Sequence, residues 1–127
     1  MIINDIEHNK YALKFNETGI QIPIKYIKVG LNNLIYMCKE YIKNNVAICH
    51  FDEKPIKFTL CLTNDDAYVI RNGNILSLIK LKETPIEIIH EIINDICDLD
   101  INDTDYFNDN YNLAILINDF KKYKNSL

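Results

Sequence analysis

The stretch from residue 46 to residue 80 reads VAICHFDEKPIKFTLCLTNDDAYVIRNGNILSLIK. Apolar and polar residues alternate over its segment 56–63, which is the period of a half-buried strand. Three more short apolar segments are separated from it by turn-forming residues: 46–51, 67–71 and 75–80. Between the last two, Asn72-Gly73 predicts a type I′ turn, because both residue types tolerate a positive φ angle. We therefore expect an antiparallel meander.

Two strands and a helix are predicted before this meander. Short alternating patterns at 11–16 and 20–24 indicate strands, and Pro23 places the second one at a sheet edge or ends it, because proline cannot donate to a ladder. The helix is predicted near 30–43, since apolar side chains recur there at steps of three and four. These side chains are Leu31, Leu34, Ile35, Cys38, Tyr41 and Ile42.

Two amphipathic helices are predicted after the meander. The first begins at Thr84-Pro85-Ile86-Glu87, where threonine can cap, proline suits the first helical position and glutamate completes a capping box. Its expected buried stripe is Ile86, Ile89, Ile93 and Ile96, widened by Ile88 and Ile92. The second carries Leu113, Leu116, Ile117 and Phe120 and ends in lysines. The fold class predicted is α+β: a single domain over 1–127, with a twisted antiparallel sheet and about three packed helices.

Length and composition exclude several classes of protein. The 127 residues suffice for one domain, and the 48% hydrophobic content is typical of a globular chain. Three scattered glycines cannot form a phosphate-cradling loop, so we expect no nucleotide cofactor. The four cysteines form no Cys-x-x-Cys pair, which favours free thiols in a reducing cytosol and no structural zinc. Without a signal or membrane-spanning pattern, we expect a cytoplasmic protein.

The charge is unevenly distributed. Residues 1–82 hold 11 Lys/Arg against 8 Asp/Glu, whereas residues 83–120 hold ten acids and no Lys or Arg. The last seven residues add three lysines, which gives the net charge of −4. One interpretation is a surface that attracts a basic partner; the other is a solvated helix face followed by a polar loop. Charge alone slightly favours the second interpretation.

No catalytic or metal-binding motif is complete. Cys49 and His50 are adjacent on a predicted strand, so their side chains should point to opposite faces. Asp98-x-Asp100-x-Asn102 resembles the start of a calcium loop, but Asp103 replaces the required glycine and Asp109 the closing glutamate. The single arginine and the lack of aromatic residues among the basic ones argue against nucleic-acid binding. We expect a non-enzymatic binding protein without metal or cofactor.

The acidic segment supplies the candidate binding residues. Carboxylates steer association with a basic partner, and exposed aromatic residues supply contact area. A basic nuclease would suit this surface, because carboxylates over its positive groove imitate phosphates. The candidate residues are Glu91, Asp95, Asp98, Asp100, Asp103, Asp105, Tyr106, Phe107 and Asp109.

The order of segments over residues 15–123 resembles the immunity proteins of bacterial contact-dependent growth inhibition systems, in particular the group of the Enterobacter cloacae immunity protein. The pattern comprises Ile22-Pro23-Ile24-Lys25-Tyr26, Leu34-Ile35-Tyr36, Ala47-Ile48-Cys49, Phe58-Thr59-Leu60-Cys61-Leu62, Ala67-Tyr68-Val69-Ile70-Arg71-Asn72, Ile75-Leu76 and residues 111–120. The resemblance implies a cytosolic inhibitor of a cognate toxin domain, often a ribonuclease or deoxyribonuclease. It also implies a twisted antiparallel sheet with packed helices and no catalytic residues.

Two other hypotheses stay open at this point. One is a phage or mobile-element inhibitor that mimics nucleic acid against a host defence enzyme; a phage operon around the gene would favour it, and a large toxin gene upstream would favour immunity. The other is a small enzyme in which Cys49 or Cys61 approaches His8, His50 or His90. The sequence also leaves open whether the protein is a monomer or a weak dimer.

Overall fold

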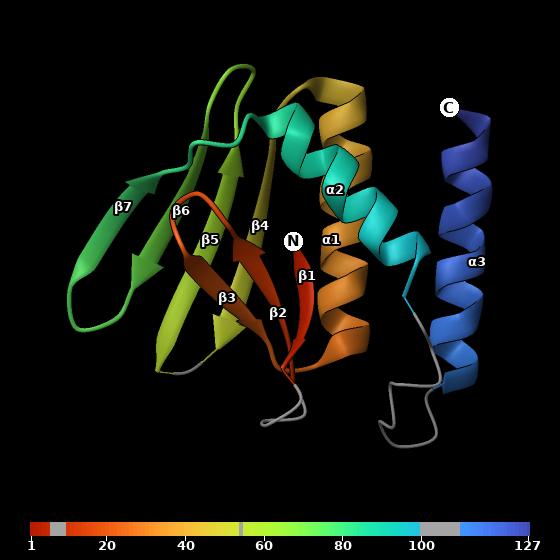
Figure 1. The fold of residues 1–127 in the computed structure, drawn as a ribbon, viewed down its shortest axis with the longest axis horizontal. Helices are drawn as coiled ribbons and strands as arrows, with labels where there is room; N and C mark the ends of the chain where they lie inside the picture. The colour runs from red at the N-terminus through yellow and green to blue at the C-terminus, as the bar shows by residue number, and fades with distance from the viewer. Residues whose placement is uncertain (6–9, 54, 100–109) are drawn as a thin grey trace.

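The computed structural model describes residues 1–5, 10–53, 55–99 and 110–127 (Figure 1). The described chain forms strands and helices in the order β1 (Ile2–Asp5), β2 (Lys10–Phe15), β3 (Ile20–Ile24), α1 (Ile27–Asn44), β4 (Ala47–Glu53), β5 (Ile56–Leu62), β6 (Ala67–Asn72), β7 (Leu76–Lys80), α2 (Pro85–Cys97) and α3 (Asn110–Ser126). The predicted α+β class is confirmed. The strands are divided between two antiparallel sheets, ordered β1-β2-β3 and β4-β5-β6-β7.

The four-stranded sheet is the predicted meander. In β5, Phe58, Leu60 and Leu62 are buried, as the alternating pattern predicts. Leu60 lies opposite Cys49 on β4 and Val69 on β6, and these neighbours are also buried. The inner face of this sheet therefore contributes one wall of the core.

The hairpin between β6 and β7 is present, but its turn differs from the prediction. Asn72 pairs with Leu76, so residues 73–75 form a three-residue connection. Within the described ranges, positive φ angles occur at Asn45 and Gly19, and Gly73 is not among them. The type I′ turn predicted at Asn72-Gly73 is therefore wrong, because strand pairing ends at Asn72 and leaves a three-residue connection in place of a two-residue turn.

The three-stranded sheet contains one strand that the sequence analysis missed. β1 pairs with β2, and Ile2 lies opposite Leu13. A four-residue strand is too short for alternation to be recognised. β3 is the last strand of this sheet, with Pro23 opposite Ala12, which confirms the predicted edge position.

The helices agree with the predicted patterns except at their margins. α1 begins at Ile27, three residues before the predicted start, and Ile42 in its last turn is 37% exposed instead of buried. α2 has the predicted capping box: the Glu87 N–H donates to Thr84 Oγ1 (3.3 Å) and the Thr84 N–H donates to Glu87 Oε2 (3.1 Å). Ile86 is 58% exposed, so its predicted place in the buried stripe is wrong. At about 100° per residue, the buried face of α2 is centred on the other isoleucines and leaves Ile86 at its margin.

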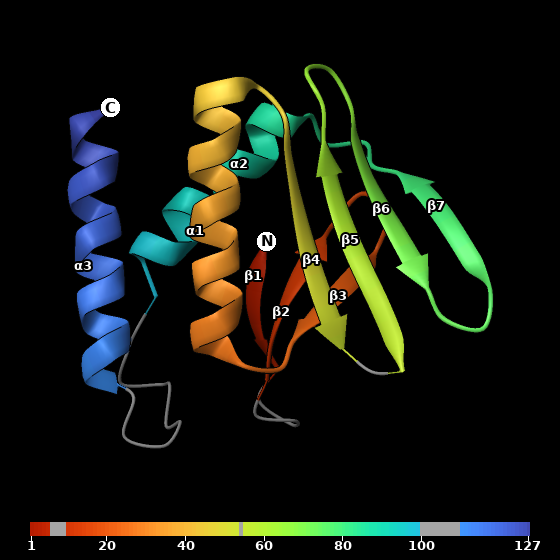
Figure 2. The same ribbon diagram turned by 180° about the vertical axis from the view of Figure 1, so that it is seen from behind.

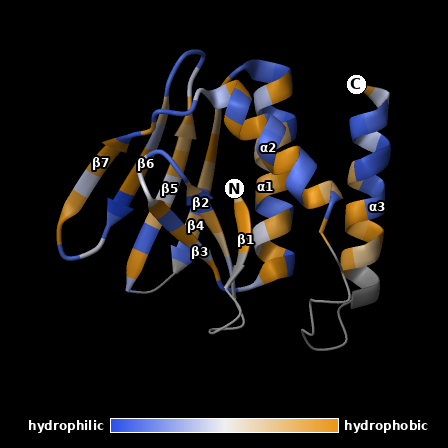
Figure 3. Ribbon diagram, viewed as in Figure 1, coloured by the Kyte–Doolittle hydropathy of each residue, from blue (hydrophilic) through white to orange (hydrophobic). Residues whose placement is uncertain are grey.

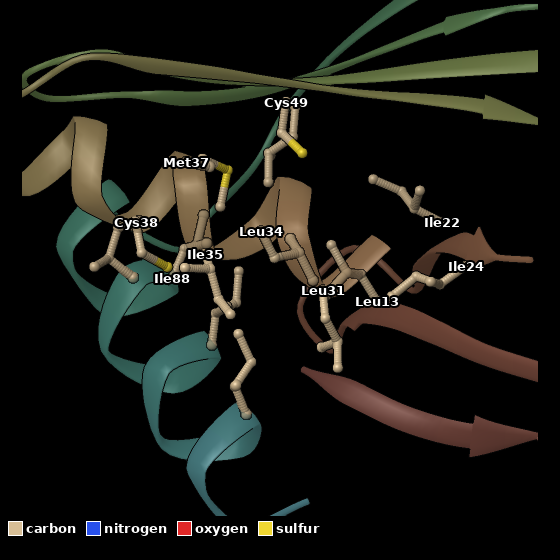
Figure 4. Packing of buried hydrophobic residues seen from close by; sticks show 14 of the residues in the cluster. Leu13, Ile22, Ile24, Leu31, Leu34, Ile35, Met37, Cys38, Cys49 and Ile88 are labelled. Atoms are coloured by element: carbon tan, nitrogen blue, oxygen red, sulfur yellow. The ribbon is translucent and has the colours of Figure 1, made fainter. Parts of the chain in front are cut away.

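One hydrophobic core joins both sheets and all three helices. α1 packs against β4 on one side and against α2 on the other, while α3 packs on α2. Leu31, Leu34 and Met37 of α1 point into the space between the sheets and α2 (Figure 4). From α3, Leu113, Ile117 and Phe120 are buried and Leu116 is half-buried. Figure 3 shows the alternation of hydrophobic and hydrophilic residues that produces these buried faces.

α3 is also tied to α2 by polar contacts. The Lys124 Nζ donates to Asn94 Oδ1 at 3.0 Å, across the two helices. The Lys39 Nζ atom of α1 lies 4.8 Å from the centre of the Tyr123 ring of α3, a cation–π contact.

None of the helices in the described part of the chain combines the length and apolarity needed to cross a membrane.

Gly30 marks the closest approach of α1 to the three-stranded sheet. It is buried, and a Cβ atom added there would overlap Cγ2 of Ile24. We expect Gly30→Ala to lower the free energy of unfolding by about 1–3 kcal/mol, although alanine in a helix is usually favoured by about 1 kcal/mol. Ile24→Ala removes Cγ2, so the double variant should lose less stability than the sum of the single variants.

Gly73→Ala is the matched control, because a Cβ there would meet Ile56 at an ordinary 3.4 Å. Its unfolding free energy in urea should lie within about 0.5 kcal/mol of the natural protein. A Gly30→Ala variant as stable as the natural protein would contradict this account of the contact.

Candidate functional site

Three of the nine predicted binding residues lie in the part of the chain that the structure describes. Glu91 on α2 and Asp98 at its C-terminal cap are exposed, and Asp95 is partly buried. The other six lie outside the described residues: Asp100, Asp103, Asp105, Tyr106, Phe107 and Asp109. The calcium-like loop from Asp98 to Asp109 falls almost wholly outside them as well.

Asp95 has a structural partner within the fold. Its Oδ2 atom lies 3.4 Å from the α-amino group of Met1 and accepts a hydrogen bond from the Ile2 N–H at 2.9 Å. These contacts fasten the start of β1 to α2. The negative charge of Asp95 is thus compensated by the α-amino group within the protein, and its attraction for a basic partner is reduced.

A group of four carboxylates lies at the other end of α2. Glu83 precedes the helix, and Glu87 and Glu91 follow at steps of four along it. Glu17 comes from the turn between β2 and β3, which lies beside the segment leading into α2 (Figures 1 and 2). We call Glu17, Glu83, Glu87 and Glu91 the acidic cluster. Three of its members are exposed, and Glu83 is half-buried.

Glu83 shows how closely these charges are crowded. Both of its carboxylate oxygens are buried and have no hydrogen-bond partner among the described residues. Burial raises the pKa of Glu83, and the nearby carboxylates of Glu17, Glu91 and Glu87 raise it further, while its own backbone N–H opposes the shift. Repulsion from Glu17, Glu87 and Glu91 therefore acts on Glu83, so the four carboxylates lie near one another at the protein surface.

Glu83 also borders a shallow cleft of about 400 Å³ between the β5–β6 turn and the segment that leads into α2. The cleft is lined by charges of both signs, including Asp66 and Lys80, which form an ion pair of 3.4 Å. A second cavity of about 140 Å³ lies between the start of α1 and β4, where His50 and Asp52 contribute to its wall. Among the described residues, no three His, Cys, Asp or Glu side chains are grouped so that they could hold a metal ion.

Among the described residues, Cys49 does not form the thiol–imidazole pair that an enzyme would need, and the candidate base His8 lies outside them. Burial raises the pKa of Cys49 to about 12, so the thiol stays protonated at neutral pH. His50 points to the opposite, exposed face of β4, and its Nδ1 atom lies 3.1 Å from Thr59 Oγ1. Burial and the neighbouring Cys49 likewise raise the pKa of Cys38 to about 12. Cys61 is half-buried, and burial raises its pKa as well.

Three members of the acidic cluster, Glu17, Glu83 and Glu87, are absent from the predicted binding residues. Glu83 belongs to the lysine-free segment, and its four-residue spacing to Glu87 is a signal that could have placed it on this surface. No signal in the sequence could place Glu17 on this surface, because Glu17 lies in the turn between β2 and β3, far from α2 in the sequence. Comparisons with protein-family models, with curated proteins and with solved structures gave no match to this chain.

The raised pKa of Glu83 makes stability depend on pH. Its protonated form is favoured by the fold, so its contribution to stability is complete below its ordinary pKa of 4.5 and is lost as the pH rises through the raised value. Glu83→Gln keeps the shape without the charge. We therefore expect the variant to be more stable than the natural protein at roughly pH 7.5 and nearly equal to it at roughly pH 4, as measured by urea unfolding.

Asp65→Asn is the control for this measurement. Asp65 lines the same cleft but is exposed, so its neutral variant should show no comparable gain that grows with pH. If the unfolding free energies of the two variants change with pH in the same way, the gain in stability comes from the lower net charge and not from the environment of Glu83.

Proposed function

We propose that this protein is a cytoplasmic immunity protein that binds and neutralises a cognate toxin domain of a bacterial contact-dependent growth inhibition system. The toxin is a nuclease, and the immunity protein occludes its basic surface without any catalytic step or cofactor. The observation that carries this proposal is the acidic cluster, in which burial raises the pKa of Glu83 and the neighbouring carboxylates raise it further.

Crowding of like charges is unfavourable for the isolated protein and favourable for a complex with a cation-rich partner. The carboxylates of Glu17, Glu87 and Glu91 each disfavour the charged form of Glu83, and cationic side chains of a partner would relieve that repulsion. Nucleases have positive grooves because they bind phosphates. A surface of closely spaced carboxylates can occupy such a groove in place of the substrate.

The rest of the fold agrees with a role in binding. Glu17 and Glu91 are exposed, and they are held by a β-turn and a helix that both pack on the core. Their positions are therefore set before the partner arrives, which lowers the entropy cost of association. The resemblance of the segment order to immunity proteins supports the choice of a toxin as the partner.

The proposal is tested with the toxin domain encoded next to this gene. A titration of the purified chain should abolish the nuclease activity of that domain at a one-to-one ratio. Glu17→Gln/Glu91→Gln should slow association roughly tenfold at low salt, because both charges act on the approach of a positive surface. The difference should shrink as salt is added, since exposed charges are screened.

Asp52→Asn/Asp65→Asn removes the same number of exposed carboxylates outside the acidic cluster. This control should associate at close to the natural rate. Equal slowing by both double variants would remove the acidic cluster from the mechanism. Absence of a complex at low salt, together with undiminished nuclease activity, would overturn the proposed function itself.

A further inference from the structure

Among the described residues, β7 is an open edge of the four-stranded sheet. It is the last strand in the order β4-β5-β6-β7 and pairs with β6 on its other side. Figures 1 and 2 show it at the outer margin of the molecule, on the side away from the helices. An edge strand exposes backbone donors and acceptors that can pair with another strand.

Natural proteins usually protect such edges with charge, proline or bulges, but this edge is apolar. Ile75, Leu76 and Leu78 are 73%, 69% and 67% exposed. Leu76 and Leu78 lie on the outer face of the sheet. They pair with Asn72 and Ile70, which are on the opposite face of β6 from the buried Val69, and residues paired directly across two strands share a face. Figure 3 shows hydrophobic residues along this strand.

The hydrogen-bond pattern identifies which backbone groups are open. The Leu81 N–H donates to the Ala67 carbonyl at 2.9 Å, so Leu81 directs its backbone groups toward β6. In an antiparallel pair this direction alternates from residue to residue, so Ser77 also faces β6. The backbone groups of Leu76, Leu78 and Lys80 consequently face the open edge.

We infer that a second copy of this chain pairs with β7 in antiparallel orientation, about a two-fold axis at Ser77. In this register Leu76 lies opposite Leu78 of the other copy, and Ile75 lies opposite Ile79. Each edge-facing residue then meets another edge-facing residue, as antiparallel pairing requires. The four-stranded sheets of the two copies become one continuous sheet.

Charge also favours this register. Lys80, a charged residue of the strand, lies opposite Asn74 of the other copy, so the two lysines do not face each other. A register centred on Leu78 would instead place Lys80 opposite Leu76 and leave a charge against an apolar side chain. The strand is therefore complementary to itself in the register centred on Ser77, and this complementarity is the reason for choosing a second copy as its partner.

The register is tested by cross-linking. Ser77 would lie opposite itself in a non-hydrogen-bonded pair, where Cα atoms are roughly 4.5 Å apart and within the range of a disulfide. Ser77→Cys should therefore form a covalent dimer under mild oxidation. Asn74→Cys, three residues away and opposite Lys80, should cross-link far more slowly, and both variants retain the native cysteines.

The affinity is tested by sedimentation equilibrium over a series of protein concentrations, with the natural chain expected to form dimers. Leu76→Glu/Leu78→Glu places like charges opposite each other and should weaken dimerisation roughly tenfold or more. Leu76→Glu/Leu78→Lys places opposite charges across the axis and should restore it. Ile48→Glu, on β4 at the far edge of the same face, should leave the dimer intact.

A natural chain that stays monomeric, with Ser77→Cys cross-linking no faster than Asn74→Cys, would overturn the inference. A dimer that survives Leu76→Glu/Leu78→Glu would also overturn it. A dimer that Ile48→Glu dissociates as much as the β7 variant does would overturn it too, since that result indicates stacking of sheet faces. A toxin that binds to β7 of a monomeric chain would also overturn self-pairing. Apart from the toxin result, these outcomes do not depend on the proposed function, because the acidic cluster is not part of β7.

Discussion

The packing of α1 between the two sheets and α2 is the constraint on which the structure depends. Leu31 and Leu34 enter the space between the sheets, and Cys38 faces Ile88 of α2 (Figure 4). The helix comes so close to β3 that Gly30 leaves room only for the Ile24 side chain. α1 packs against β4 and α2, and at Gly30 it also meets β3, so it contacts both sheets and α2. The surfaces that remain exposed follow from this arrangement.

Two such surfaces have different chemistry and lie on different elements. The acidic cluster joins the β2–β3 turn to the start of α2, where burial of Glu83 intensifies the repulsion among its neighbours. The edge of β7 is apolar and presents backbone groups of a single strand. The first surface suits a cationic partner, and the second suits another strand. The two surfaces adjoin at the cleft that is lined by Lys80 of β7 and by Glu83.

Much of the local structure was predictable because short-range rules govern it. The capping box at Thr84 and Glu87 and the alternating burial of β5 depend on residues only a few positions apart. The errors occurred where packing decides the outcome. Ile86 has the spacing of the buried stripe but lies at the margin of the face that α2 turns toward the core. Asn72-Gly73 has the composition of a tight turn, yet strand pairing with Leu76 sets a longer one.

The sequence by itself determined the class of fold, the order of the helices and of every strand except β1, and the acidity of the C-terminal third, since these follow from periodicity and composition. Only the tertiary structure decided that Glu17 joins Glu83 and that Asp95 is compensated by the α-amino group of Met1. Both contacts join residues more than sixty positions apart in the chain. Electrostatic energy depends on distance in space, and that distance is set by the packing of whole elements rather than by any local pattern.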